Sequence, residues 1–96
     1  MISVAETMRQ KLSAALEPAE LDIVDDSHRH VGHAGHDGQG ESHFKLRIVS
    51  PAFAGQSRVE RQRLVYRILA AELAGRVHAL GVVTLTPEEA ERLARG

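Results

Sequence analysis

The chain contains no cysteine and no tryptophan, and aromatic residues make up only 3% of its 96 residues. Without cysteine, it can supply neither a disulfide bond nor a thiolate ligand to a metal. Because aromatic residues are so few, we expect the core to be built from Leu, Val, Ile and Ala. No apolar run is long enough to span a membrane. The formal net charge of −1 argues against a chain that coats nucleic acid over its whole surface.

The length and the N-terminal segment indicate the number of domains and the location of the protein. Ninety-six residues suit one modest core, so we expect a single domain over residues 1–96. The segment "MISVAETMRQKL" has a helical pattern and lacks the apolar region of a signal peptide. We therefore expect a cytoplasmic protein without a membrane association.

Three segments begin with the helix-capping pattern in which Ser or Thr is followed three residues later by Glu. The pairs are Ser3 with Glu6, Ser57 with Glu60, and Thr86 with Glu89. The first predicted helix ends before Pro18, the second runs to Gly75, and Pro87 opens the third.

The segments between these helices have the features of β-strands. "LDIVD" and "HFKLRIVS" alternate in period two, and "RVHALGVVTL" is rich in β-branched residues and apolar on both sides. The predicted order is αββαβα, an α+β domain with a three-stranded sheet packed against helices. The first two strands should form an antiparallel hairpin, with residues 25–43 as its flexible loop, rich in His and Gly.

That loop holds five of the six histidines of the chain. Imidazole binds Zn, Cu, Ni and iron, and several imidazoles on one loop can close around an ion. Two interpretations of four of these residues are open: His28, His30, His33 and His36. They are either metal ligands, which could bind Zn or Ni even without a partner protein, or solvated loop residues. His43 should end the loop or pack where the next strand starts. The isolated His78 is either a core histidine bonded to the backbone or a ligand.

Other residues bear on catalysis and on binding. The chain has no phosphate-binding Gly-Lys-Ser/Thr loop and no convincing nucleophile, so we do not expect an enzyme. The one basic cluster lies on the second predicted helix, at Arg58, Arg61, Arg63 and Arg67. It is either a solvated helix face or a surface for an acidic partner or for phosphates.

Several segments together resemble one known family, in the right order and over nearly the whole chain. They are "DDSH", "ESHF", "IVSPAFAGQSRVERQRLVYRIL", "EL" and "VHAL", followed by a Thr-Pro before the last helix. This arrangement is similar to that of the BolA family. The chain has Arg61-Gln62-Arg63 where the family commonly has Arg-His-Arg. The resemblance implies a fold similar to class II KH domains, without a functional GxxG motif.

The resemblance also implies a function. BolA-like proteins pair with monothiol glutaredoxins and share a [2Fe-2S] cluster, for which the glutaredoxin Cys and glutathione supply thiolates. This chain would supply His78 and one loop histidine, His30 in the first place, with His33 and His36 as alternates. Such a protein would take part in iron–sulfur assembly or trafficking. Some bacterial members are DNA-binding regulators of stress response, cell morphology and biofilm, a role that the arginines of the second helix could serve.

Overall fold

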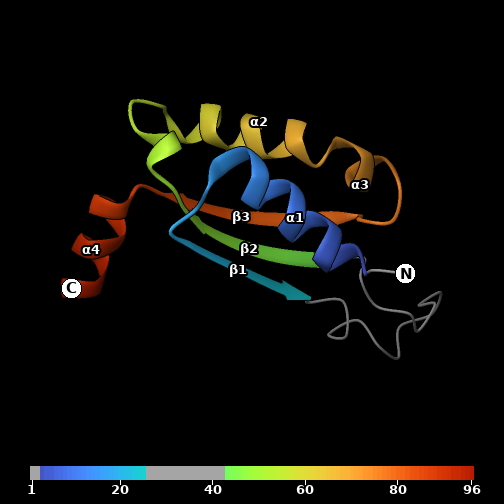
Figure 1. Cartoon of the computed structure of the whole chain (residues 1–96), viewed down its shortest axis with the longest axis horizontal. Helices are drawn as coiled ribbons and strands as arrows, with labels where there is room; N and C mark the ends of the chain where they lie inside the picture. The colour runs from blue at the N-terminus through green and yellow to red at the C-terminus, as the bar shows by residue number, and fades with distance from the viewer. Residues whose placement is uncertain (1–2, 26–42) are drawn as a thin grey trace.

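The computed structural model describes residues 3–25 and 43–96, which form one sheet with helices packed on it (Figure 1). The elements are α1 (Val4–Leu16), β1 (Glu20–Asp25), β2 (His43–Val49), the short 3-10 helix η2 (Pro51–Phe53), α2 (Arg58–Ile68), α3 (Ala70–Ala74), β3 (Ala79–Leu85) and α4 (Pro87–Arg95). The predicted α+β class and the order αββαβα are confirmed, except that the second helix is divided into α2 and α3.

The three strands lie in the order β1-β2-β3. β1 and β2 pair antiparallel, with Asp25 opposite Phe44, as the hairpin prediction requires. β2 and β3 pair parallel, with His43 opposite Ala79. The end of β1 and the starts of β2 and β3 therefore meet at one edge of the sheet, while the segment 26–42 lies outside the described residues.

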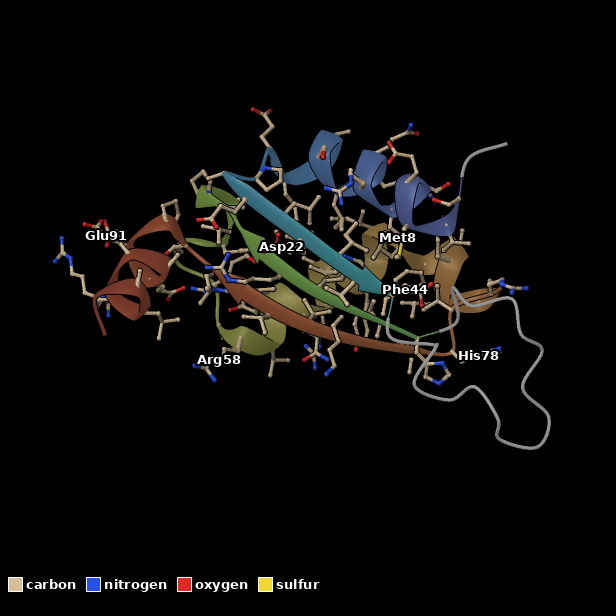
Figure 2. All side chains as sticks on the ribbon, turned by 90° about the horizontal axis from the view of Figure 1, so that it is seen from below. Met8, Asp22, Phe44, Arg58, His78 and Glu91 are labelled. Carbon is tan, nitrogen blue, oxygen red and sulfur yellow. The ribbon has the colours of Figure 1, made fainter. Side chains whose placement is uncertain are left out.

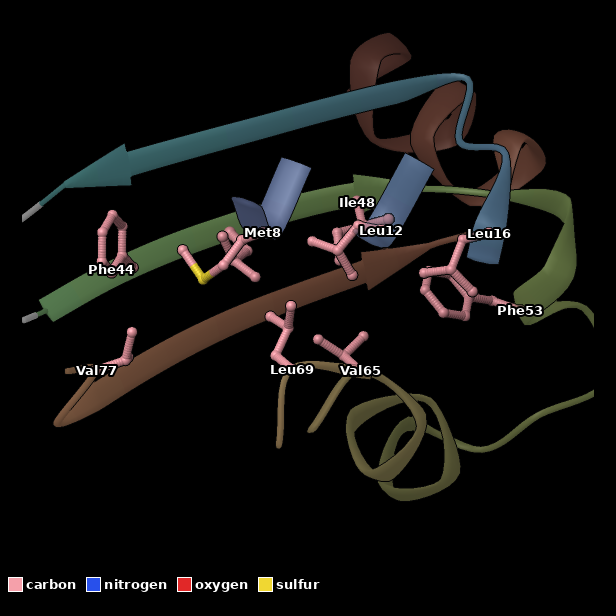
Figure 3. Packing of buried hydrophobic residues seen from close by; sticks show 10 residues of the cluster. Met8, Leu12, Leu16, Phe44, Ile48, Phe53, Val65, Leu69 and Val77 are labelled. Carbon is pink, nitrogen blue, oxygen red and sulfur yellow. The ribbon is translucent and has the colours of Figure 1, made fainter. Parts of the chain in front are cut away.

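The core lies between the sheet and the helices α1, α2 and α3, which cover one of its faces (Figure 1). The predicted stripe of α1 is confirmed, because its four-residue spacing buries Met8, Leu12 and Leu16 against the sheet. Facing side chains complete the cluster (Figure 3): Phe44, Leu46, Ile48, Phe53, Val65, Leu69 and Val77. Burying a side chain of this size contributes about 1.5–3 kcal/mol, so this face supplies most of the stabilisation.

Helix starts follow the predicted capping chemistry. The hydroxyl of Ser3 accepts a hydrogen bond from the backbone N–H of Glu6 at 3.0 Å. The starts of α2, at Ser57, and of α4, at Thr86, are complete capping boxes in which the Glu side chain also accepts from the cap N–H. Each cap satisfies backbone donors that would otherwise lack a partner. It stabilises the helix by about 1 kcal/mol.

Two predicted boundaries are wrong. The helix expected to run from Ser57 to Gly75 breaks at Leu69, whose ψ of 21° lies outside the helical range. Leu69 is fully buried and Leu73 of α3 packs, partly buried, against the same core, so the conformation at the break is set by tertiary packing, which helical periodicity does not report. The third strand begins at Ala79 rather than Arg76, and it is covered on one face only, since Val83 is 52% exposed.

Candidate metal-binding site and basic surface

His78 lies just before β3 and its side chain is exposed. Figure 2 shows it at the end of the molecule opposite to Glu91 of α4. The preceding Val77 is buried, and its N–H donates to the carbonyl oxygen of Glu72 at 3.0 Å. The interpretation of His78 as a core histidine is therefore wrong. The residue has a fixed backbone and an imidazole that solvent, or a partner, can reach.

The nearest described histidine to His78 is His43, the first residue of β2. Their ring centroids lie 6.5 Å apart and the ring planes are tilted by 55°. His43 is half-buried and begins the strand, which confirms the expectation that it packs at the strand start. Sequence reasoning did not connect His43 with His78, because only the parallel pairing of β2 with β3 brings the two strand starts together.

The predicted loop ligands His30, His33 and His36, like His28, lie outside the described residues. The topology nevertheless shows where their segment joins the sheet: it leaves β1 after Asp25 and enters β2 at His43, beside His78. Within residues 3–25 and 43–96, no group of three or more His, Asp or Glu side chains is arranged to hold a metal ion. The described part of the chain thus contributes two imidazoles at this edge.

The four arginines predicted to form a basic surface on α2 do not behave alike. Arg58, Arg63 and Arg67 are exposed, whereas Arg61 is 7% exposed. The guanidinium of Arg61 donates to both carboxylate oxygens of Glu89 in α4, at 2.6 and 3.2 Å. It also donates to the carbonyl oxygens of Gln56, at 2.9 Å, and Thr84, at 3.3 Å. Arg61 therefore joins α2, β3 and α4, and three arginines remain on the solvent side.

The ion pair changes the acidity of its carboxylate. The hydrogen bonds donated by Arg61, followed by the backbone N–H of Thr86, lower the pKa of Glu89 to about 2. The guanidinium carbon of Arg61 also lies 5.8 Å from the ring centroid of Phe53, within the range of a cation–π interaction. Glu89 is therefore ionised throughout the neutral range, and the pair holds α4 to the rest of the domain.

Position 62, where the sequence departs from the family pattern, has a local role. Gln62 donates from Nε2 to the hydroxyl of Tyr66 at 3.0 Å. That hydroxyl in turn donates to the carbonyl oxygen of Leu80 in β3, at 3.1 Å. The amide thus supports a side-chain contact between α2 and the edge strand.

A groove of about 540 Å³ lies between the start of α2, the end of β3 and α4. Arg58 and Arg92 line it together with the apolar Leu85 and Leu93. Its lining includes Thr84 and Leu85 at the end of β3, whereas His78 precedes the start of that strand, so the groove and His78 lie at opposite ends of the sheet. Among the described residues, no helix is both long and apolar enough to pass through a lipid bilayer.

The structure therefore defines a small α+β domain with one exposed and one half-buried imidazole at one end of its sheet and exposed arginines on one helix. Residues 12–89 match the family described as BolA-like protein, and the chain belongs to that family. It is 43% identical to the DNA-binding transcriptional regulator BolA of Escherichia coli strain K12, over 94% of this chain and 82% of that protein.

A plant relative is also similar to this chain. The chain is 49% identical to Protein BOLA1, chloroplastic, of Arabidopsis thaliana, over 88% of this chain and 54% of that protein. It thus spans about half the length of this relative. The solved structure of BolA1 from Arabidopsis thaliana superposes with a TM-score of 0.83 at 47% identity, covering 93% of this chain and 97% of that one. Family and fold are therefore established together.

Proposed function

We propose that this protein is an iron–sulfur assembly or trafficking partner that shares a [2Fe-2S] cluster with a monothiol glutaredoxin. It would act in the cytoplasm as a binding module rather than as an enzyme. The observation that carries the proposal is the exposed imidazole of His78, on a fixed backbone beside the point where the histidine-rich segment joins the sheet.

The donor set of the chain fits such a shared cluster. Without cysteine, it can offer no thiolate to iron, so the thiolates must come from the glutaredoxin Cys and from glutathione, with imidazoles as the ligands of this chain. Of its own residues, His78 would be one ligand, and His30 the second, with His33 or His36 as alternates. Histidine ligation in place of cysteine raises the reduction potential of a [2Fe-2S] cluster, as in Rieske centres.

The division of roles suits a cluster that passes between proteins. His78 is set by the buried Val77 on one side and by β3 on the other, so its position is defined before a partner arrives. A second ligand from the segment that begins after Asp25 could then complete the site on the same edge of the sheet.

Anaerobic reconstitution with a monothiol glutaredoxin and glutathione tests the proposal. We expect a coloured heterodimer with the visible absorption and circular dichroism of a [2Fe-2S] cluster. The His78→Ala variant should still bind glutaredoxin but lose the stable cluster, whereas His30→Ala should lose less, because His33 or His36 can take its place. Thr84→Ala serves as the control, because Thr84 lies in β3, the strand that begins directly after His78. A colourless mixture with the wild-type chain would refute the proposal.

A second candidate function is DNA binding for transcriptional regulation of stress response, cell morphology and biofilm. It is favoured by the exposed Arg58, Arg63 and Arg67 on α2 and by the similarity to a relative named as a DNA-binding transcriptional regulator. Arginines that contact phosphates release counterions, so binding should weaken steeply as salt rises.

Duplex DNA binding at low salt tests this second function. The double variant Arg58→Ala/Arg63→Ala should bind all sequences more weakly, by similar factors, and with a shallower salt dependence. The double variant Arg9→Ala/Arg95→Ala removes the same charge from α1 and α4 and serves as the control. Equal weakening in both variants would show an effect of net charge alone, and would argue against a DNA surface on α2.

A further inference from the structure

The described residues bring together two histidines that the predicted ligand set does not combine, His43 and His78. We propose that these two imidazoles form a binding site of their own for a single divalent metal ion of the Zn²⁺, Ni²⁺ or Cu²⁺ class, with water completing the coordination. Imidazole nitrogen is a preferred donor for these ions. The site needs neither His28, His30, His33 and His36 nor a glutaredoxin, so it goes beyond the proposed function.

The separation of the rings is close to what one ion requires. With metal–nitrogen bonds of about 2.0–2.1 Å, two imidazoles on one ion have centroids about 4.5–6.4 Å apart, depending on the angle at the metal. The observed separation of the centroids is 6.5 Å. At the tetrahedral angle that Zn²⁺ prefers, the centroids would lie about 5.2 Å apart, so the exposed His78 side chain has to rotate toward His43 by more than about 1 Å for both rings to bind one ion.

The backbone holds both residues in place before any metal binds. His43 lies opposite Ala79 in the parallel pairing, so its neighbour in the other strand is the residue directly after His78. Phe44 and Val77, next to the two histidines, are each only 2% exposed and are anchored in the core. Because binding then orders only two side chains, the second imidazole acts at a high effective concentration.

The exposure of the two rings is compatible with binding a small cation. His78 is exposed and His43 is half-buried, so an ion can reach both and keep several water ligands. The pair therefore differs from a structural metal site, which is closed and has four protein ligands.

The test uses the full chain with His28, His30, His33 and His36 all replaced by Asn, so that His43 and His78 are the only imidazoles left. Calorimetric titration with Zn²⁺ and with Ni²⁺ should show one ion per chain. Side-chain nitrogen signals of both histidines should shift together in NMR spectra. Adding either His43→Ala or His78→Ala should weaken binding at least about tenfold, since the second ligand is lost. Adding Val83→Ala, an exposed position of the same sheet, should leave the affinity unchanged.

Circular dichroism of each variant confirms that the fold is retained. Absence of one-to-one binding in the four-Asn chain would overturn the inference. Undiminished affinity in both alanine variants would overturn it as well, by placing the ion elsewhere. The wild-type heterodimer reports on the shared cluster in a separate experiment, so a failure of the two-histidine site and a failure of the proposed function can be told apart.

Discussion

Replacing Arg61 with methionine is expected to destabilise the domain strongly, although the residue belongs to the cluster that the sequence suggested as a binding surface. The methionine keeps an apolar stem of similar length in a site where the arginine side chain is 9% exposed. It removes the donors that serve Gln56, Thr84 and Glu89, which lie in three different parts of the chain.

The size of the effect follows from these contacts. Net contributions are about 0.5–1.5 kcal/mol for a hydrogen bond between neutral groups and about 1.5–3 kcal/mol where a charged group takes part. Water can replace part of what is lost, because the Glu89 side chain is 34% exposed. We therefore expect Arg61→Met to lower the free energy of unfolding by about 3 kcal/mol, at the lower end of what breaking a fully buried ion pair costs. For a domain of this size, that corresponds to a fall in Tm of about 12–24 °C.

Urea unfolding followed by far-UV circular dichroism measures this change. Arg58→Met is the matched control, since it removes the same group from the exposed side of the same helix and should alter stability by less than about 0.5 kcal/mol. Equal stability of the two variants would refute the structural role of Arg61. Arg61 would then be equivalent to the solvent-facing arginines of α2.

Three further outcomes are expected. The lowered pKa of Glu89 stabilises the fold above the ordinary carboxyl value of 4.5, and this stabilisation is lost as pH falls toward about 2, so acid unfolding curves of wild type and Glu89→Gln should converge in that window. Leu69→Ala should cost about 2–5 kcal/mol in chemical unfolding because the side chain is fully buried. Leu93→Ala, which changes the same residue type at 67% exposure, should cost almost nothing in the same measurement. His78→Ala should leave Tm nearly unchanged, because the imidazole is exposed; a fall of more than a few degrees would mean that the ring supports the core.

Much of the fold could be predicted from local chemistry. The cap at Ser3 and the capping boxes at Ser57 and Thr86 use atoms within three residues of each other, so the sequence alone predicts where α1, α2 and α4 begin. The spacing of Met8, Leu12 and Leu16 likewise predicts which face of α1 is buried. The break at Leu69 could not be predicted in this way, since the helical period continues past it and the backbone conformation of Leu69 depends on how its side chain packs in the core.

The candidate site, like the fold, could be predicted from the sequence only in part. The sequence shows that the chain has imidazoles and no thiols, and it places most of the imidazoles between two strands. It does not show whether His78 is buried, because the apolar neighbours suggested a core position, and exposure depends on which residues pack around a strand start. The helical spacing of the α2 arginines similarly gives no sign that Arg61 turns inward toward Glu89, 28 residues further along the chain.

By itself, the sequence determined the elements, their capping residues, the donor chemistry and, through its motifs, the family, because each of these depends on residue type and short-range spacing. The tertiary structure alone decided that β2 and β3 run parallel. Period-two alternation is the same for either direction of pairing, but only the parallel direction places the first residues of the two strands side by side. That choice brings His43 to His78, 35 positions apart in the sequence, and puts both imidazoles at the end of the sheet where we propose a metal site.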